Sequence, residues 1–126
     1  MLIDSHSHID TEAFDADRTA TILRARAAGV HAQIVPAIAK SGWDHLRQVC
    51  HAHAGLYPAY GLHPMAVAEH EPQHLLDLAA IIKDEQPLAI GECGLDLFVE
   101  GLDRDRQYHY FNAQLELARD HDLPVI

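Results

Sequence analysis

Two histidines near the start of the chain have the residue type and the spacing to bind one metal ion. His6 and His8 lie in the segment Ile3 to Asp10, whose apolar flanks are typical of a β-strand. Side chains alternate between the faces of a strand, so both imidazoles would point the same way, about 6 to 7 Å apart along it. One nitrogen from each ring could then bind a single transition-metal ion. We therefore predict a metal site at His6 and His8.

A second pair with the same spacing serves as a control. The chain has 11 histidines in 126 residues, a density at which about one His-x-His pair is expected by chance. The other pair, His51 and His53, lies in residues 43–54, a pattern typical of a helix, where residues two apart do not face each other. We expect this pair on the surface. We also expect no chemistry from the remaining histidines in or beside helical stretches, which are His31, His45, His70, His74, His109 and His121.

A carboxylate in a glycine-flanked motif is the second candidate for chemistry. Glu92 ends a predicted strand over residues 88–92 and lies between Gly91 and Gly94, which leave space for a ligand or a turn. We expect Glu92 to face the centre of the sheet, where a carboxylate can bridge two cations, and Cys93 to face the helices. The alternative for Glu92 is a structural carboxylate that caps a turn. Asp96 is either a substrate-binding group or a turn residue.

His63 is the third candidate. It follows a predicted strand over residues 56–62, and Pro64 keeps it out of a helix. Its imidazole could donate a hydrogen bond to a substrate oxygen or to an oxyanion in the transition state. The alternative is a packed or exposed loop histidine without a chemical role.

The elements that must position these residues alternate regularly along the chain. Hydrophobic patterns predict strands over residues 1–9, 31–38, 56–62, 88–92 and 123–126, and helices over residues 17–29, 43–54, 73–85 and 104–122. Such α/β alternation predicts a parallel sheet covered by helices. An open doubly wound sheet and a (β/α)₈ barrel both fit. Candidate residues at several strand ends, and the lack of a glycine-rich phosphate loop after the first strand, favour the barrel.

The length of the chain suggests part of such a barrel. A complete barrel has about 250 residues, roughly twice the 126 present. Because the sequence stops within the apolar run Leu123 to Ile126, we expect residues 1–126 to form one partial domain truncated within the fifth strand, with five parallel strands and four helices. A genuine small domain with a C-terminal edge strand is the alternative. Exposed strands would make the fragment prone to self-association.

Composition narrows the function classes. The formal net charge is −10 and no cluster of Lys and Arg stands out, which argues against nucleic-acid binding through a basic surface. Phosphate groups on a substrate would have to be neutralised by bound cations or by a part of the protein outside this sequence. There is no apolar run long enough for a membrane span and no signal peptide, so we expect a cytoplasmic protein. Cys50 and Cys93 do not suggest a disulfide framework, and we expect two buried thiols.

Taken together, these motifs resemble the TatD family of metal-dependent hydrolases. The resemblance rests on the segments 3–10, 61–64 and 89–96, and on residues 106–126, in order and over the whole chain. It implies a barrel of the amidohydrolase type with two divalent metal ions (Mg, Mn, Zn or Co) and hydrolysis of phosphodiesters, typically DNA. His6 and His8 would bind one metal, and Glu92 would bridge both as the catalytic carboxylate. The remaining ligands implied by the family, two histidines and an aspartate, belong to later strands absent from this sequence.

Two other function classes stay open. One is another metallohydrolase of the same superfamily that cleaves an amide, a lactone or an aminoacyl ester, although the motif from Gly91 to Asp96 argues against most of these. The other is a non-catalytic metal-binding or interaction fragment. We expect the chain alone to have weak nuclease activity or none, because it supplies three of the implied ligands.

Overall fold

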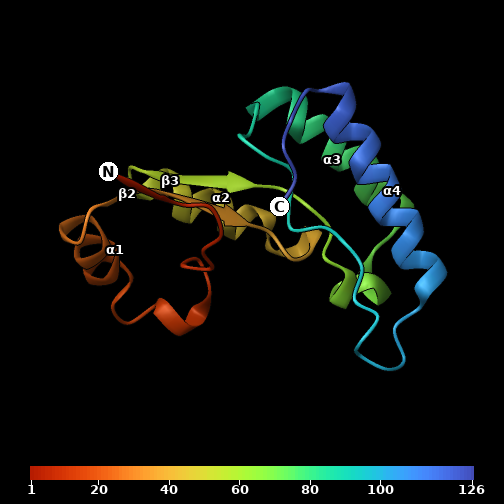
Figure 1. Ribbon diagram of the computed structural model, residues 1–126, viewed down its shortest axis with the longest axis horizontal. Coiled ribbons are helices and arrows are strands. Elements are labelled where there is room, and N and C mark those ends of the chain that lie inside the picture. Colours follow the sequence, from red (N-terminus) through yellow and green to blue (C-terminus); the bar gives the residue numbers. More distant parts are fainter.

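The computed structural model describes all residues from 1 to 126 and has a parallel sheet at its centre (Figure 1). Its three strands are β1 (Leu2–Asp4), β2 (Val30–Pro36) and β3 (Leu56–Ala59), in the spatial order β1-β2-β3. Two single parallel bridges continue the sheet, from Tyr60 to Ile90 and from Ile90 to Val125. The parallel order predicted from the sequence is therefore observed, with the fourth and fifth strands reduced to bridges.

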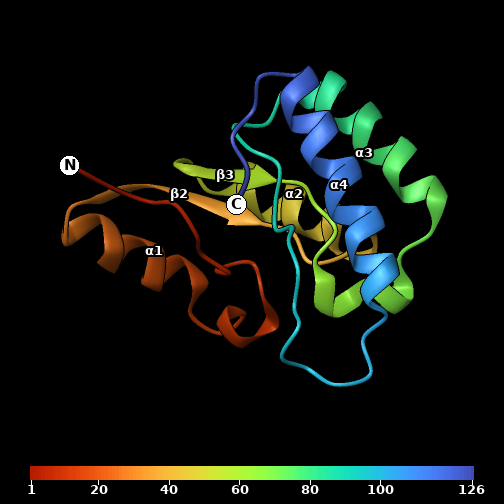
Figure 2. The ribbon, with the colours of Figure 1, turned by 45° about the vertical axis from the view of Figure 1, so that its right-hand side comes forward.

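Four α-helices connect these segments, as the sequence predicts. They are α1 (Arg18–Ala27), α2 (Trp43–Ala52), α3 (Pro72–Glu85) and α4 (Arg104–Asp120), and three short 3₁₀ helices are η1 (Glu12–Phe14), η2 (Lys40–Gly42) and η3 (Pro64–Glu69). Figures 1 and 2 show α3 and α4 side by side next to the bridged end of the sheet, with α1 at the opposite end. No helix combines the length and the apolar character that a membrane span requires.

The predicted first strand is too long, since β1 ends at Asp4 instead of residue 9. The Asp4 carboxylate accepts a hydrogen bond from the backbone N–H of His6 at 3.1 Å, a local bond that competes with the strand ladder. After Asp4, the chain bonds to β2 once more, where the Ser7 N–H donates to Ile34 O at 3.0 Å. His6 and His8 thus lie in the loop after β1, and strand alternation does not explain their orientation.

The segments predicted as strands four and five lie beside their neighbours but share few backbone hydrogen bonds with them. Ile90 N–H donates to Pro124 O at 3.0 Å, and Ile126 N–H donates to Ile90 O at 2.9 Å. The peptide bond between Gly91 and Glu92 is cis. A Cβ atom on Gly61 would lie 2.7 Å from Gly91 O and 2.8 Å from Glu92 N, so only glycine fits at position 61.

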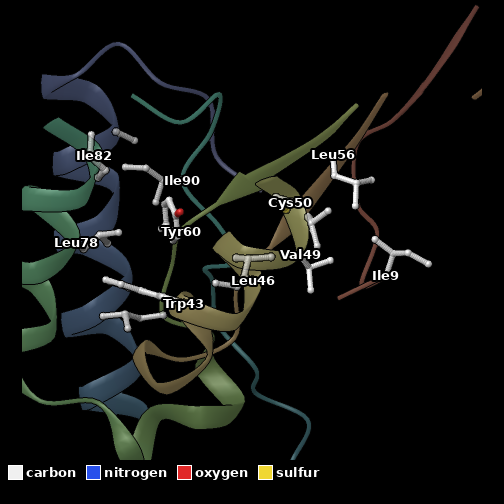
Figure 3. Packing of buried hydrophobic residues seen from close by; sticks show 14 of the residues in the cluster. Ile9, Trp43, Leu46, Val49, Cys50, Leu56, Tyr60, Leu78, Ile82 and Ile90 are labelled. Atoms are coloured by element: carbon white, nitrogen blue, oxygen red, sulfur yellow. The ribbon is translucent and has the colours of Figure 1, made fainter. Parts of the chain in front are cut away.

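The hydrophobic core lies between the sheet and the helices (Figure 3). The apolar face of α2, with Trp43, Leu46 and Val49, belongs to the same buried cluster as Tyr60 and Ile90. Burying a large apolar side chain contributes roughly 1.5–3 kcal/mol, so this cluster fixes α2 against β3 and the first bridge. The core thereby sets the position of the strand ends.

The other face of the sheet has no helix against it. Ile3 pairs with Ala32, and Ile34 pairs with Tyr57. Residues two apart in a strand share a face, so Ile3 and Tyr57 lie on the same side of the sheet. Their exposed fractions are 64% and 41%. This uncovered face agrees with the expectation of exposed strands.

Candidate metal centre

Three predicted ligands converge at the carboxyl end of the sheet. The Nε2 atoms of His6 and His8 are 3.2 Å apart, and they lie 3.1 and 3.3 Å from Oε2 of Glu92. In a tetrahedral site with metal–ligand bonds near 2.0–2.1 Å, donor atoms are about 3.3–3.4 Å apart. A single cation could therefore contact all three donor atoms. The site is accessible, because the His6 side chain is exposed and the other two are half-buried.

The carboxyl end of β2 brings the histidine loop and Glu92 together. Ile34, within β2, accepts the hydrogen bond from Ser7, the residue between the two histidines. Three residues later, Ala37 N–H donates to Gly91 O at 3.1 Å, and Glu92 N–H donates to Ala37 O at 2.8 Å. One strand end thus carries backbone bonds to both halves of the site.

Arg18 braces the loop that follows the two histidines. Its guanidinium donates to Ile9 O at 2.8 Å and to the carbonyl oxygens of Asp10 and Thr11 at 2.9 Å each. His45 on α2 donates from Nε2 to the same Asp10 carbonyl at 2.9 Å. Sequence reasoning missed Arg18, although a cation in the first turn of a helix opposes the helix dipole and is a signal of another use.

Asp10 belongs to this loop and has a partly buried side chain. Burial raises the pKa of Asp10, and a backbone hydrogen bond and the neighbouring basic side chains, Arg18 among them, oppose that rise. Its Oδ1 atom is buried without a hydrogen-bond partner. The sequence did not single out Asp10 as a functional residue.

His63 contacts the second oxygen of Glu92. Its Nε2 lies 3.0 Å from Glu92 Oε1, while its Nδ1 accepts a hydrogen bond from Met65 N–H at 3.0 Å. Because Nδ1 accepts, the proton of the neutral ring is on Nε2 and is donated to Glu92. The structure therefore brings His63 into the site as a partner of a candidate ligand. A direct contact of His63 with substrate stays a prediction.

His70, which the sequence did not connect to the site, supports His63 from behind. It is 2% exposed, and its Nε2 donates to the backbone O of His63 at 2.8 Å. Its Nδ1 has no partner. Burial lowers the pKa of His70, which keeps the ring neutral. The ring packs edge-to-face on Tyr110 of α4, with centroids 5.2 Å apart.

Asp96 lies outside the group formed by His6, His8 and Glu92. Its Oδ1 accepts hydrogen bonds from Phe98 N–H at 3.0 Å and Val99 N–H at 2.9 Å, which is turn chemistry. A role for Asp96 in substrate binding stays a prediction.

The two cysteines are unpaired. Cys50 is buried, but Cys93 is only half-buried. The pKa of Cys50 is raised to about 12, mainly by burial and to a smaller extent by the charge of Asp10. The pKa of Cys93 is raised to about 11, mainly by burial and to a smaller extent by the charge of Glu92. Both side chains are therefore thiols at neutral pH, and neither is an activated nucleophile.

Comparisons with known proteins show the family to which the chain is related. The family described as TatD related DNase matches residues 3–126. The chain is 36% identical to the uncharacterized metal-dependent hydrolase YjjV of Escherichia coli K12, covering 98% of this chain and 49% of that protein. It is 32% identical to the 3'-5' ssDNA/RNA exonuclease TatD of Cronobacter turicensis, covering 98% of this chain and 47% of that protein.

A solved structure gives the same result. The crystal structure of YjjV, a TatD homologue from Escherichia coli, superposes with a TM-score of 0.91 at 36% identity, over 98% of this chain and 49% of that one. The chain thus spans about half the length of the relatives it matches. The likeness confirms the predicted fold class, an α/β fold that is the N-terminal part of a (β/α)₈ barrel. Because the family match covers nearly the whole sequence, the chain belongs to the TatD-related DNase family.

Proposed function

We propose that this chain carries one side of the catalytic metal site of a hydrolase that cleaves phosphodiester bonds in nucleic acid. The observation that carries the proposal is the triangle of donor atoms from His6, His8 and Glu92, which has the dimensions of a cation site. The name of the Cronobacter relative supports nucleic acid as the substrate.

The donor set fits a divalent transition metal. Two imidazole nitrogens and one carboxylate oxygen suit zinc, manganese or cobalt, whereas magnesium favours a shell with more oxygen ligands. When bound, such cations supply an activated water and neutralise phosphate oxygens. Neutralisation matters here because the chain has a formal net charge of −10. Two ions per complete site, as the family resemblance implies, are part of this proposal.

The residues of the chain have separate roles in this proposal. His6 and His8 each offer one Nε2 atom to the ion, and Glu92 offers Oε2 to the same ion while its Oε1 accepts a hydrogen bond from His63. The Nε2–H group of His63 is directed at the site, and it could donate a hydrogen bond to a phosphate oxygen of a bound substrate in place of Glu92. Asp96 orders the segment that follows Glu92 and is the second candidate for substrate contact. We also propose a cytoplasmic location.

A substrate panel tests the proposal. The purified chain is incubated with 3'-labelled single-stranded DNA or RNA and with manganese, zinc or magnesium, beside the full-length exonuclease TatD of Cronobacter turicensis. We expect slow cation-dependent cleavage at most, far below the full-length relative, and its loss with EDTA or in Glu92→Gln. Cleavage that survives EDTA would contradict a metal-dependent reaction, and turnover equal to that of the full-length exonuclease would contradict the expected weakness of the chain alone.

Two results would select the alternative functions. Hydrolysis of aminoacyl esters or lactones by YjjV and by the chain, with nucleic acid untouched, would favour another amidohydrolase-type activity. Zinc binding that requires His6, without hydrolysis of any substrate, would favour a non-catalytic metal-binding fragment. Equal zinc binding by wild type and His6→Ala would remove the proposed site altogether.

A further inference from the structure

Two glutamines on α4 are buried where the helical pattern alone would not demand polar side chains. Gln107 and Gln114 are 1% and 0% exposed. They are seven residues apart, which is close to two helical turns, so they lie on the same face of α4. Their side chains form hydrogen bonds to Leu62, Tyr110 and Asp96 and not to the candidate metal ligands.

Gln114 pairs with the backbone of the residue before His63. Its Oε1 accepts from Leu62 N–H at 2.8 Å, and its Nε2 donates to Leu62 O at 3.1 Å and to Tyr110 O at 3.0 Å. The side-chain amide thus replaces the strand neighbour that Leu62 lacks beyond the end of β3. Both amide hydrogens and the carbonyl oxygen of Gln114 are thus bonded to backbone groups.

Gln107 pairs in the same way with the backbone of Asp96, in the segment that follows Glu92. Its Oε1 accepts from Asp96 N–H at 2.7 Å, and its Nε2 donates to Asp96 O at 2.9 Å. Asp96 in turn holds the amides of Phe98 and Val99 through its carboxylate. One buried amide therefore fixes the start of the segment that leads from Glu92 to α4.

The position of these bonds suggests more than packing. Buried backbone N–H and C=O groups in irregular segments need partners, and an apolar residue of similar size would fill the space without providing them. The two clamped residues are those that come directly before His63 and four residues after Glu92. Both lie in irregular segments beyond the sheet, since Leu62 follows the bridge at Tyr60 and Asp96 follows the bridge at Ile90.

We propose that Gln107 and Gln114 are positioning residues that set the site from behind, each through one segment: Gln114 places His63, and Gln107 places Asp96 and residues 97–99. A catalytic meaning for these two segments rests on the proposed function. The positioning of the two segments by Gln107 and Gln114 does not rest on the proposed function, and spectroscopy tests it without any hydrolysis assay.

The test compares Gln114→Met and Gln107→Met by NMR of ¹⁵N-labelled chain, with the His63 ring signal assigned through its loss in His63→Gln. We expect Gln114→Met to shift or broaden the Leu62 amide and His63 ring signals while the Phe98 and Val99 amides stay in place. Gln107→Met should give the reverse pattern. The exposed Gln73→Met on α3, which bonds only its neighbour Asp77, is the matched control and should change neither set.

Measurements on the wild type keep the proposal testable if either variant fails to fold. The amides of Leu62 and Asp96 should exchange slowly with solvent, and the side-chain NH₂ groups of the two glutamines should show NOEs to these residues. Equal perturbation of both segments by either variant would overturn the proposal, as would no perturbation by either or fast exchange of both amides. Failure of the nuclease assay would leave these results unaffected and would bear only on the proposed function.

Discussion

At the scale of single residues, Glu92 uses its two oxygens for different partners. Oε2 faces His6 and His8, and Oε1 accepts a hydrogen bond from Nε2 of His63. An outer partner of this kind orients a ligand without touching the ion, and its removal typically costs about 10–100-fold in metal affinity. His63 can therefore be separated experimentally from the ligands themselves.

The first prediction concerns His63→Ala. Without the Nε2 donor, Glu92 is free to rotate, and the zinc dissociation constant should rise by about 10–100-fold. Isothermal titration calorimetry measures this directly. The control is His51→Ala, at an exposed helical position away from the site, which should bind zinc as the wild type does. Unchanged affinity in His63→Ala would contradict the assigned role.

The second prediction concerns the buried ring of His70. Burial lowers the pKa of His70 in the folded chain, whereas the unfolded chain titrates at about pH 6.5. As the pH falls through that value, the unfolded state binds a proton that the folded state does not, so His70 makes the fold less stable in acid.

His70→Gln isolates this effect, because glutamine can still donate to His63 O but does not titrate. We expect the stability advantage of the wild type over His70→Gln to shrink as the pH is lowered from about 7.5 to about 5.5. Urea unfolding at each pH measures the difference. The exposed His51→Gln serves as control, and a difference independent of pH for His70→Gln would argue against a neutral buried ring.

At the scale of elements, the segments after β3 and around Ile90 approach each other at the backbone level. Gly61 and Gly91 lie in direct contact, and a Cβ on Gly91 would in turn meet the Cβ of Ile126 at 2.8 Å. Glu92 follows directly, so the spacing of these backbones sets where its carboxylate lies.

The third prediction therefore concerns Gly61→Ala. The added methyl group would press on Gly91 O and Glu92 N, and overpacking of this kind costs about 1–3 kcal/mol of unfolding free energy. Thermal and urea unfolding give the stability, and calorimetry should show weakened zinc binding because Glu92 is displaced. Gly42→Ala is the matched control, since nothing lies within 4 Å of its Cβ position. Equal stability of the two variants would contradict the close approach.

The helices were the elements best predicted from the sequence. Residues 73–85 were expected as a helix, and α3 runs over Pro72–Glu85, because apolar spacing and a starting proline are local signals. Strand ends were harder, since a local bond from Asp4 stops β1 and non-local pairing decides the rest. The sequence singled out His6, His8 and Glu92, which the fold brings together, but strand alternation was the wrong reason for the histidine pair because β1 ends at Asp4. Their role as metal ligands stays a prediction. His70 and the α4 glutamines could not be predicted, because their partners become visible only after folding.

At the scale of the whole molecule, one face of the sheet and the β1 edge are open. β1 pairs only with β2, and its residues are all exposed. An apolar edge strand with unpaired backbone groups is a template for association with another chain. The family relatives are about twice as long, so the surface that this chain exposes need not be exposed in them.

The fourth prediction follows from this edge. We expect the chain to self-associate with rising concentration, and Ile3→Lys to reduce the association because a lysine on an edge strand opposes pairing. Light scattering coupled to size-exclusion chromatography measures the mass. Leu76→Lys on α3 is the control, since Leu76 and Ile3 are both 64% exposed. A monomeric wild type, or an equal effect of both lysines, would contradict the prediction.

The bracing of the histidine loop by Arg18 has a consequence for how the site assembles in time. The three backbone bonds from Arg18 close loops of only seven to nine residues, whereas Glu92 reaches His6 across 86 positions of sequence. Short loops close early and long-range contacts come late. The turn at residues 9–11 can thus form while the rest of the chain is still disordered, and we expect the contact between Glu92 and His6 to form later. In refolding with cobalt present, an absorbance band that differs between two and three protein ligands would then measure the rate at which Glu92 joins the two histidines.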